Sequence, residues 1–359
     1  SSSSSGQLNS AKDAQTFHKE VLPGYRPTRL IPIELETKST SALPSSRFQG
    51  RCFIKAEDDR FGLPAFKVLG ASWASFLALC DLLECQPERT SLEELRRLAS
   101  GLELVAATDG NHGCAVAWFA SLLGIRSQIF TPSSVSQNSI DQIRSMGEKV
   151  SVNRLATDYD RAVLHAASHA RDSLCRVLVQ DTAWEGYTLT PHRIVDGYST
   201  IFSEVDEALG GKAPTHVIVP VGVGSLAQSV VRHYSTKRST TEIISVEPET
   251  AACLYTSLLS GENIPIQTGE TVMPGLNCGT VSSIAWPELL RGVLAAVKVR
   301  DCDVLETVNQ LEAKDVRAGP CGAAPLAALS ILLQNPNVAQ NLGLLDDPDV
   351  TVVLLMTEG

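Results

Sequence analysis

Short apolar runs rich in β-branched residues alternate with helical patterns along most of this chain. This alternation limits the possible folds more than any other feature, because it is typical of βαβ units in which helices cover parallel strands. We predict helices over 113–123, 136–146 and 158–171, each preceded by a small or polar residue that can cap it. The predicted strands are 102–107, 126–130, 149–153, 176–180, 215–221, 242–246, 296–299 and 350–356. The fold class is therefore α/β.

The length of the chain predicts two domains. A chain of 359 residues exceeds the size of one ordinary hydrophobic core. Pro191 opens a long helical segment, which places one boundary near residue 190, and a second boundary falls near Lys67. We expect a large domain formed by 1–66 and 191–359, and a smaller substrate-binding domain formed by 67–190.

Composition narrows the class of partner. The net charge of -10 and the absence of clustered Lys and Arg argue against nucleic acid. The weakly polar stretches 68–83 and 321–333 are shorter than the ~20 residues that span a bilayer, so we expect no membrane partner. Nine cysteines without a Cys-x-x-Cys pair are typical of reduced thiols. We therefore expect a cytoplasmic protein that acts on a small molecule.

Lys67 has apolar neighbours on both sides, Phe66 and Val68 among them. An isolated ammonium group is costly to remove from water, so a lysine in such a setting is usually paired or chemically used. A Schiff base with a carbonyl cofactor is one such use. The alternative is a lysine whose amine reaches the surface from an amphipathic helix.

The turn Thr108-Asp-Gly-Asn-His-Gly113 follows a predicted strand and precedes a predicted helix. In open α/β sheets, ligands lie beyond the carboxyl ends of strands, where helix N-termini attract anions. The turn is therefore a candidate binding site for a substrate carboxylate. It could also be only a turn built from good turn residues.

A glycine-rich loop, Pro220-Val-Gly-Val-Gly-Ser-Leu226, occupies the same kind of position after another strand. Its glycines allow backbone amides to approach a phosphate. A dinucleotide is the competing ligand, because Gly222, Gly224 and Ala227 match the dinucleotide fingerprint and Glu247 follows ~20 residues later. A nicotinamide site, however, leaves Lys67 and the 108–113 turn unexplained.

Two residue pairs are weaker candidates. His165 and His169 have the spacing of a zinc pair, but no glutamate follows the first histidine. Cys80 and Cys85 are expected to pack at a helix end rather than to bind metal or form a disulfide. We therefore predict no metal site.

Together these segments resemble the fold type II pyridoxal phosphate enzymes, the tryptophan synthase β-like fold, and most closely the branch of ammonia-lyases that act on diaminopropionate. The resemblance is carried by Phe17-His18 and by the segments 22–28, 60–63, 65–67, 108–113, 180–187, 222–225, 275–280 and 357–359. It implies two open, twisted, mostly parallel sheets flanked by helices, with pyridoxal 5'-phosphate in the cleft between the domains. It also implies a homodimer.

The same resemblance assigns the site residues. Lys67 would bind the cofactor as a Schiff base, and Asp109 and Asp181 would act beside it on the substrate. The other cofactor contacts would come from Asn111 to the ring hydroxyl oxygen, Gly222, Val223, Gly224 and Ser225 to the phosphate, and Cys321 to the pyridine nitrogen. Thr108, Gly110 and His112 would bind the substrate.

The implied reaction is β-elimination on a small amino acid, with 2,3-diaminopropionate giving pyruvate and ammonia. Lys67 would take the α-proton of the L-substrate, and Asp109 that of the D-substrate. Ala56, Asp58, Pro320 and Cys321 depart from the usual pattern of these lyases. A serine or threonine dehydratase, a β-replacing biosynthetic enzyme, a nicotinamide-dependent dehydrogenase and a catalytically silent binding protein therefore stay open as alternatives.

Overall fold

The computed structural model describes residues 14–35, 48–108, 110–237 and 239–359, which divide into two compact units. Unit 1 contains the chain up to Arg26, Lys67–Asp181 and Glu185–Ser203. Unit 2 contains Pro27–Phe66, Thr182–Trp184 and Glu204–Gly359. The chain thus enters the main part of unit 1 at Lys67. The assignment of 67–190 as a substrate-binding domain, with 1–66 and 191–359 as a cofactor domain, stays a prediction.

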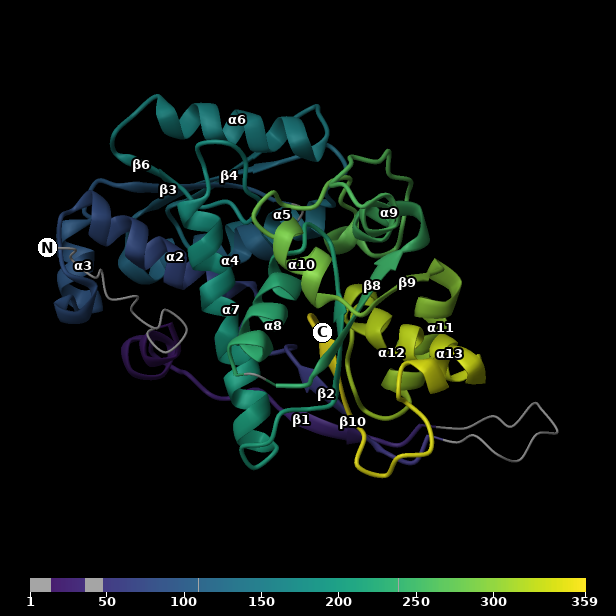
Figure 1. The fold of residues 1–359 in the computed structure, drawn as a ribbon. Coiled ribbons are helices and arrows are strands. Elements are labelled where there is room, and N and C mark those ends of the chain that lie inside the picture. The colour runs from purple at the N-terminus through teal and green to yellow at the C-terminus, as the bar shows by residue number, and fades with distance from the viewer. Residues whose placement is uncertain (1–13, 36–47, 109, 238) are drawn as a thin grey trace, which may run out of the picture. The chain divides into compact units, whose positions relative to one another are not determined.

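Unit 1 is built on a parallel four-stranded sheet with the order β5-β4-β3-β6. Figure 1 shows α6 on one face of this sheet and α2 and α4 on the other. The strands are β3 (Glu103–Ala107), β4 (Arg126–Thr131), β5 (Val150–Arg154) and β6 (Arg176–Leu178). The helices are η1 (Phe17–Val21), α2 (Lys67–Leu82), η2 (Pro87–Arg89), α3 (Leu92–Leu98), α4 (Asn111–Leu123), α5 (Gln137–Arg144), α6 (Tyr159–Arg171) and most of α7 (Leu189–Ala208).

The helices of unit 1 begin and end where local chemistry favours it. The Ser136 side chain accepts a hydrogen bond from the Ser139 N–H at the start of α5, and Asp158 does the same for Arg161 in α6. Gly124 ends α4 in the left-handed conformation, with φ 68°. The three predicted helices are therefore confirmed to within a few residues.

Unit 2 is built on a six-stranded sheet with the order β1-β2-β10-β7-β8-β9. Only β1 and β2 pair antiparallel, and every other neighbouring pair is parallel. The strands are β1 (Leu30–Ile33), β2 (Arg51–Ala56), β7 (His216–Pro220), β8 (Glu242–Pro248), β9 (Ala295–Val299) and β10 (Thr351–Met356). The helices are α8 (Ser225–Thr236), η3 (Glu249–Ala251), α9 (Cys253–Ser260), η4 (Pro274–Leu276), α10 (Trp286–Gly292), α11 (Asp301–Glu312), α12 (Pro320–Leu333) and α13 (Pro336–Asn341).

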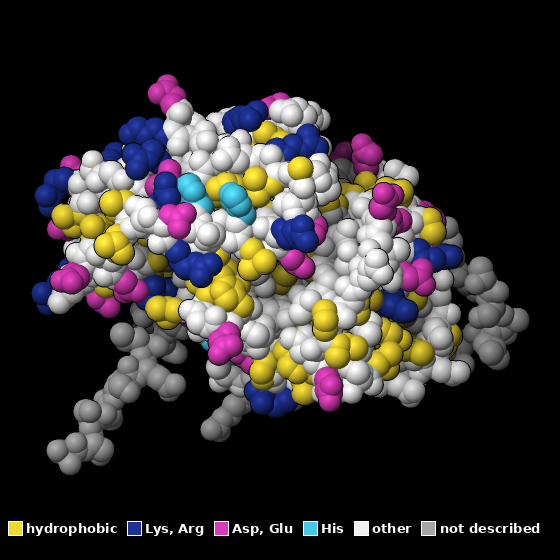
Figure 2. Space-filling model, turned by 90° about the horizontal axis from the view of Figure 1, so that it is seen from above, with side chains coloured by type: hydrophobic (Ala, Val, Ile, Leu, Met, Phe, Trp, Pro, Cys, Tyr) yellow, Lys and Arg dark blue, Asp and Glu magenta, His cyan; other side chains and the backbone are white. Residues whose placement is uncertain are grey.

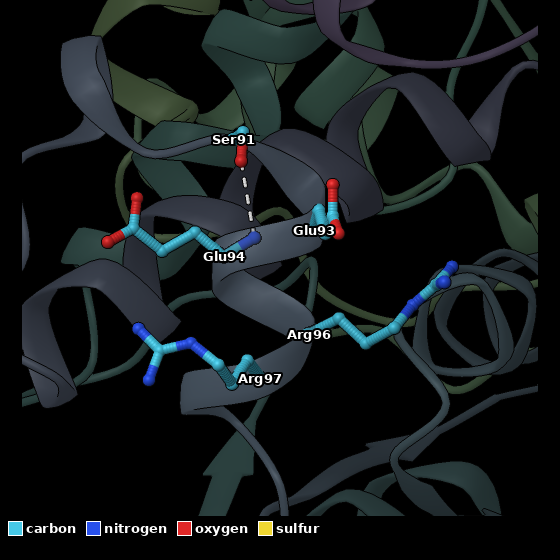
Figure 3. A pocket seen from close by; sticks show the side chains of 5 residues that line it. All are labelled: Ser91, Glu93, Glu94, Arg96 and Arg97. Atoms are coloured by element: carbon cyan, nitrogen blue, oxygen red, sulfur yellow. Dashed lines mark hydrogen bonds between the residues drawn. The ribbon is translucent and has the colours of Figure 1, made fainter.

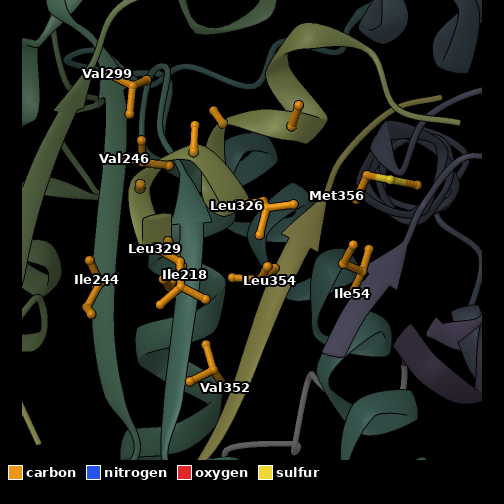
Figure 4. Close-up of a cluster of buried hydrophobic side chains, with 14 of the residues drawn as sticks. Ile54, Ile218, Ile244, Val246, Val299, Leu326, Leu329, Val352, Leu354 and Met356 are labelled. Carbon is orange, nitrogen blue, oxygen red and sulfur yellow. The ribbon is translucent and has the colours of Figure 1, made fainter. Parts of the chain in front are cut away.

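The core of unit 2 lies between this sheet and the apolar helix α12. Figure 4 shows Leu326 and Leu329 of α12 among Ile218, Ile244 and Leu354 of the strands. These side chains are buried, and each removes apolar surface from water. The strand ends that carry the candidate site are therefore held by a continuous core.

All eight predicted strands are present, with ends that shift by one or two residues. The parallel α/β class predicted from their alternation is confirmed. The sequence did not indicate β1 and β2. Within the described residues, no helix combines the length and the apolar character needed to cross a membrane.

Candidate active site

Lys67 is the first residue of α2, and its amine pairs with a carboxylate. Its Nζ lies 2.5 Å from Oδ2 of Asp181, and the two side chains are 23% and 5% exposed. Burial raises the pKa of Asp181, but the charge of Lys67 and its hydrogen bond outweigh this and lower that pKa to about 2. The residues that follow Lys67, Val68 and Leu69, are fully buried. Lys67 is thus a paired lysine in an apolar setting.

His112 lies within electrostatic reach of this pair. Its Nε2 and the Val179 carbonyl oxygen are 2.8 Å apart, which makes Nε2 the protonated donor. Burial lowers the pKa of His112, and Lys67 lowers it further against the opposing effect of Asp181. The Nδ1 atom is buried without a hydrogen-bond partner among the described residues. His112 therefore offers a neutral acceptor nitrogen.

Tyr198 on α7 is the third member of this group, and the sequence reasoning missed it. It is buried, which raises the pKa of its hydroxyl, and the charges of Lys67 and Asp181 both act on it. Two helix glycines bring it there. A Cβ on Gly70 would lie 2.5 Å from Tyr198 Cε1, and one on Gly197 would lie 2.6 Å from the Leu69 carbonyl oxygen. Glycine inside two helices was the signal that could have predicted this close crossing.

Asp181 is held in place by the residues around it in the Gln180-to-Tyr187 block. The Gln180 Oε1 accepts from the Ala107 N–H at 3.0 Å, and its Nε2 donates to the Tyr159 hydroxyl at 2.9 Å. The Tyr187 hydroxyl accepts from the Gln180 N–H at 2.9 Å and donates to the Leu178 carbonyl oxygen at 3.0 Å. These bonds fix the backbone that presents Asp181.

The turn at the end of β3 is stabilised from within. The Thr108 Oγ1 accepts from the N–H groups of Gly110 at 2.9 Å and Gly113 at 3.0 Å. Gly110 has φ 154° and precedes Asn111, the first residue of α4. Asp109 lies outside the described residues. The turn thus forms at the predicted place, while substrate contacts by Thr108, Gly110 and His112 stay predictions.

The predicted phosphate loop, 222–225, lies in unit 2 between β7 and α8. Gly224 caps α8 with φ 94°, a left-handed conformation that favours glycine. A Cβ on Gly222 would lie 2.8 Å from the Gly275 carbonyl oxygen and 3.1 Å from Cys278 Sγ. Both glycines are therefore required by the backbone. The loop leads directly into the N-terminus of a helix, where phosphate groups bind readily.

Glu247 has a structural use that conflicts with a dinucleotide site. Its two carboxylate oxygens accept from the Leu254 and Tyr255 N–H groups, each at 2.7 Å, at the start of α9. Burial raises the pKa of Glu247 to about 7 despite these bonds. A fully buried carboxylate that caps a helix is not available to a ribose hydroxyl, so the dinucleotide interpretation of this loop loses its acidic residue.

Cys321 lies in the first turn of α12 and is buried. Burial raises the pKa of its thiol well above the usual value, and the nearby Glu358 carboxylate raises it further. Glu358 Oε1 also accepts the Cys321 backbone N–H at 3.2 Å. A Cβ on Gly275 would lie 3.4 Å from the sulfur. Cys321 therefore has a neutral thiol beside the Glu358 carboxylate, and its contact with the pyridine nitrogen stays a prediction.

Four buried charged residues form a network in unit 2 near the unusual positions Ala56 and Asp58. Lys55 Nζ lies 2.5 Å from Glu204 Oε2, and Arg60 pairs with both Glu57 and Glu204 at 2.7 Å. Asp58 instead pairs with the exposed Arg29 at 2.7 Å. Asp58 is thus partly buried and pairs outside the network, whereas Glu57 belongs to it.

In the described part of the chain, no cluster of three or more potential metal ligands occurs. His165 and His169 pack edge-on against Phe130, with ring centroids 4.9 and 5.3 Å away. A surface hollow on α3, shown in Figure 3, is lined by Ser91, Glu93, Glu94, Arg96 and Arg97. It contains none of the predicted site residues.

One face of the molecule carries positive and negative side chains together. On the face shown in Figure 2, Lys and Arg side chains are interspersed with Asp and Glu. A nucleic-acid backbone needs a continuous positive surface, and this face does not offer one.

A family model for pyridoxal-phosphate dependent enzymes matches residues 21–356. The chain belongs to this family. It is 32% identical to diaminopropionate ammonia-lyase of Escherichia coli (strain K12), covering 97% of this chain and 88% of that protein. The Salmonella typhimurium diaminopropionate ammonia-lyase is 34% identical, with 98% and 89% covered.

A solved structure extends the comparison to three dimensions. The crystal structure of the Escherichia coli diaminopropionate ammonia-lyase in complex with an aminoacrylate-PLP azomethine reaction intermediate gives a TM-score of 0.83 at 30% identity. It covers 98% of this chain and 88% of that chain. The fold type II class predicted from the sequence is thereby confirmed, and so is the dependence on pyridoxal phosphate.

Proposed function

We propose that this protein catalyses β-elimination of ammonia from 2,3-diaminopropionate to give pyruvate and ammonia. The proposal rests on the ion pair between Lys67 and Asp181 in a chain that resembles diaminopropionate ammonia-lyases over nearly its whole length. Pyridoxal phosphate, when bound, supplies the electron sink for the carbanion that forms at the α-carbon.

The described residues suit this cofactor. Lys67 offers an amine at the start of a helix, and we assign it to the covalent bond with the cofactor. The loop 222–225 offers glycines whose positions exclude a Cβ, and we assign it to the phosphate. Cys321 offers a neutral thiol for the pyridine nitrogen, and Asn111 begins α4 and is assigned to the ring hydroxyl oxygen.

Asp181 favours an amine over a hydroxyl as the leaving group. Its low pKa keeps it ionised at neutral pH, and Lys67 is its cation partner in the free protein. Once the Lys67 amine is bonded to the cofactor, the carboxylate can bind another cation. The distal ammonium group of diaminopropionate is such a cation, whereas the hydroxyl of serine or threonine is neutral. We therefore assign Asp181 to the distal amine.

Proton transfer at the α-carbon is assigned to two bases. Lys67, once released, is an amine suited to the L-substrate, and Asp109 is assigned to the D-substrate. His112 is neutral and keeps an acceptor nitrogen in this region, so it can accept a hydrogen bond from a substrate ammonium group.

The test is product release from a panel of both diaminopropionate enantiomers, serine and threonine. Diaminopropionate should yield twice as much ammonia as pyruvate, because both nitrogens leave the carbon skeleton. Serine would yield equal amounts. A higher kcat/KM for serine or threonine than for either diaminopropionate enantiomer would replace this proposal with a dehydratase.

We also propose a cytoplasmic homodimer. All nine cysteines carry thiols and none is in a disulfide, as expected in a reducing compartment, and two-fold assemblies are the most common oligomers. Light scattering after size exclusion measures the assembly directly, and the mass of one chain alone would refute the dimer.

A further inference from the structure

The end of helix α2 folds the chain back so that two cysteines meet. Glu84 adopts φ 52°, a left-handed conformation that is usually filled by glycine at this position of a helix end. The Cys85 N–H then donates to the Cys80 carbonyl oxygen at 3.0 Å, and the Leu83 N–H donates to that of Leu79 at 2.9 Å. In this type of helix end, the two residues joined by the bond that spans five positions commonly have neighbouring side chains. Here these residues are Cys80 and Cys85.

Here both residues joined by the Cys85-to-Cys80 bond carry thiols. Cys80 is fully buried and Cys85 is half-buried, so only Cys85 is open to reagents from solvent. Burial raises the pKa of the Cys80 thiol, and the hydrogen bond and charge of Cys85 raise it further. Asp81, next to Cys80, pairs with Arg193 at 2.6 Å. Neither cysteine contributes to the candidate active site.

Cys80 and Cys85 lie at a helix end as thiols, as the sequence predicted. Beyond that prediction, we propose that they form a reversible, peroxide-oxidisable thiol pair that closes to a disulfide at the end of α2. Two cysteines cannot be bridged when their Cα atoms lie more than ~7 Å apart, and the 3.0 Å bond from the Cys85 N–H to the Cys80 carbonyl oxygen keeps them within that limit. The proposal does not depend on the reaction assigned to the protein.

The chemistry proceeds in two balanced steps with hydrogen peroxide as the oxidant. The exposed Cys85 sulfur attacks the peroxide, an S–O bond forms, the O–O bond breaks and one water leaves, which gives a sulfenic acid. The Cys80 sulfur then attacks the Cys85 sulfur, the S–O bond breaks and a second water leaves. The two thiols lose two electrons to one peroxide molecule. Reduction by a dithiol restores both thiols.

The sequence makes the test simple, because trypsin releases both cysteines on one peptide, residues 68–89, that contains no other cysteine. The purified holoprotein is treated with hydrogen peroxide, alkylated after unfolding, digested and weighed. The peptide should lose two hydrogens and both alkylation sites, and dithiothreitol should restore them. Cys85→Ser should abolish this change, whereas Cys175→Ser, which removes an exposed thiol in the same unit, should leave it intact.

Two results would overturn the proposal. One is a peptide 68–89 in which Cys80 remains fully alkylatable while Cys85 carries sulfinic or sulfonic acid. The other is a peptide 68–89 joined to a different peptide. The Cys80→Ser variant adds a second measurement, because Cys85 should then be trapped as a dimedone adduct. Absence of that adduct would exclude Cys85 as the attacking thiol.

Discussion

A single amine decides whether the protein can bind its cofactor covalently. Lys67→Ala removes the Nζ atom that pairs with Asp181 and keeps the apolar start of α2. We expect loss of the borohydride-stable cofactor label and a fall in ammonia release of at least about 10²-fold. Absorption spectroscopy and a product assay measure both effects. Elimination by the Lys67→Ala protein at a rate close to that of the wild type would refute the assignment.

Asp181→Asn keeps the shape of the side chain and removes its charge. Because the carboxylate is proposed to bind the distal ammonium group, kcat/KM for diaminopropionate should fall by roughly 10- to 10²-fold, the effect of losing one charge-assisted hydrogen bond. Activity with serine, if present, should fall less. An equal loss for both substrates would mean that Asp181 orients Lys67 or the cofactor instead.

The same residue affects stability at low pH. In the cofactor-free protein, where Lys67 pairs with Asp181, the pKa of Asp181 falls from 3.8 to about 2 on folding, so its contribution to stability is present above pH 3.8 and is lost as the pH falls toward 2. Asp181→Asn should therefore flatten the acid-unfolding curve within this window.

At the scale of helices, α8 provides a matched pair of serines. Ser225 begins the helix after the phosphate loop, and Ser229 lies one turn further along, also buried. Ser225→Ala should weaken pyridoxal phosphate binding by about 10- to 100-fold, the effect of a hydrogen bond to a charged group. Ser229→Ala should leave the affinity nearly unchanged. Cofactor titration followed by fluorescence measures both, and equal affinities for the two variants would count against the loop assignment.

Glu247 of β8, which accepts hydrogen bonds at the start of α9, makes the stability of the protein depend on pH. The pKa of this carboxyl rises from 4.5 to about 7 on folding, mainly because of burial. Stability is therefore fully present below pH 4.5 and declines as the pH rises toward 7, by about 1.4 kcal/mol for each pKa unit. Glu247→Gln should remove this slope. Urea unfolding across that pH range gives the answer, and parallel curves for the two proteins would contradict it.

The elements show what a single sequence can predict. Strands from residue 102 onward were found because their β-branched runs alternate with helices along the chain. Strands β1 and β2 were missed for physical reasons. β1 contains Pro32, a residue that argues against a strand, and Lys55 of β2 is buried with its charge compensated by Glu204, far away in the chain. Tyr198 and Glu358 were missed likewise, since tertiary packing brings them to their positions.

At the scale of the molecule, the buried charge network joins segments that are distant in sequence. Hydrogen bonds and the charge of Arg60 overcome the effect of burial and lower the pKa of Glu204 to about 2. Arg60→Met would leave Lys55 alone to balance two buried carboxylates. We expect a loss of about 3–5 kcal/mol in the free energy of unfolding. Arg29→Met, which breaks an exposed ion pair with Asp58, should cost at most ~1 kcal/mol. Urea denaturation compares the two, and similar losses would refute a special role for the network.

The position of β10 sets the order in which the molecule can be completed during synthesis. This strand lies between β2 and β7, and it pairs Leu354 with both Ile54 and Ile218. The hairpin of β1 and β2 emerges early from the ribosome, yet it has no partner strand until residues 351–356 are made. By contrast, all four strands of the smaller sheet lie within residues 103–178. One edge of β2 therefore has no partner strand for most of translation, and unpaired strand edges are prone to aggregate.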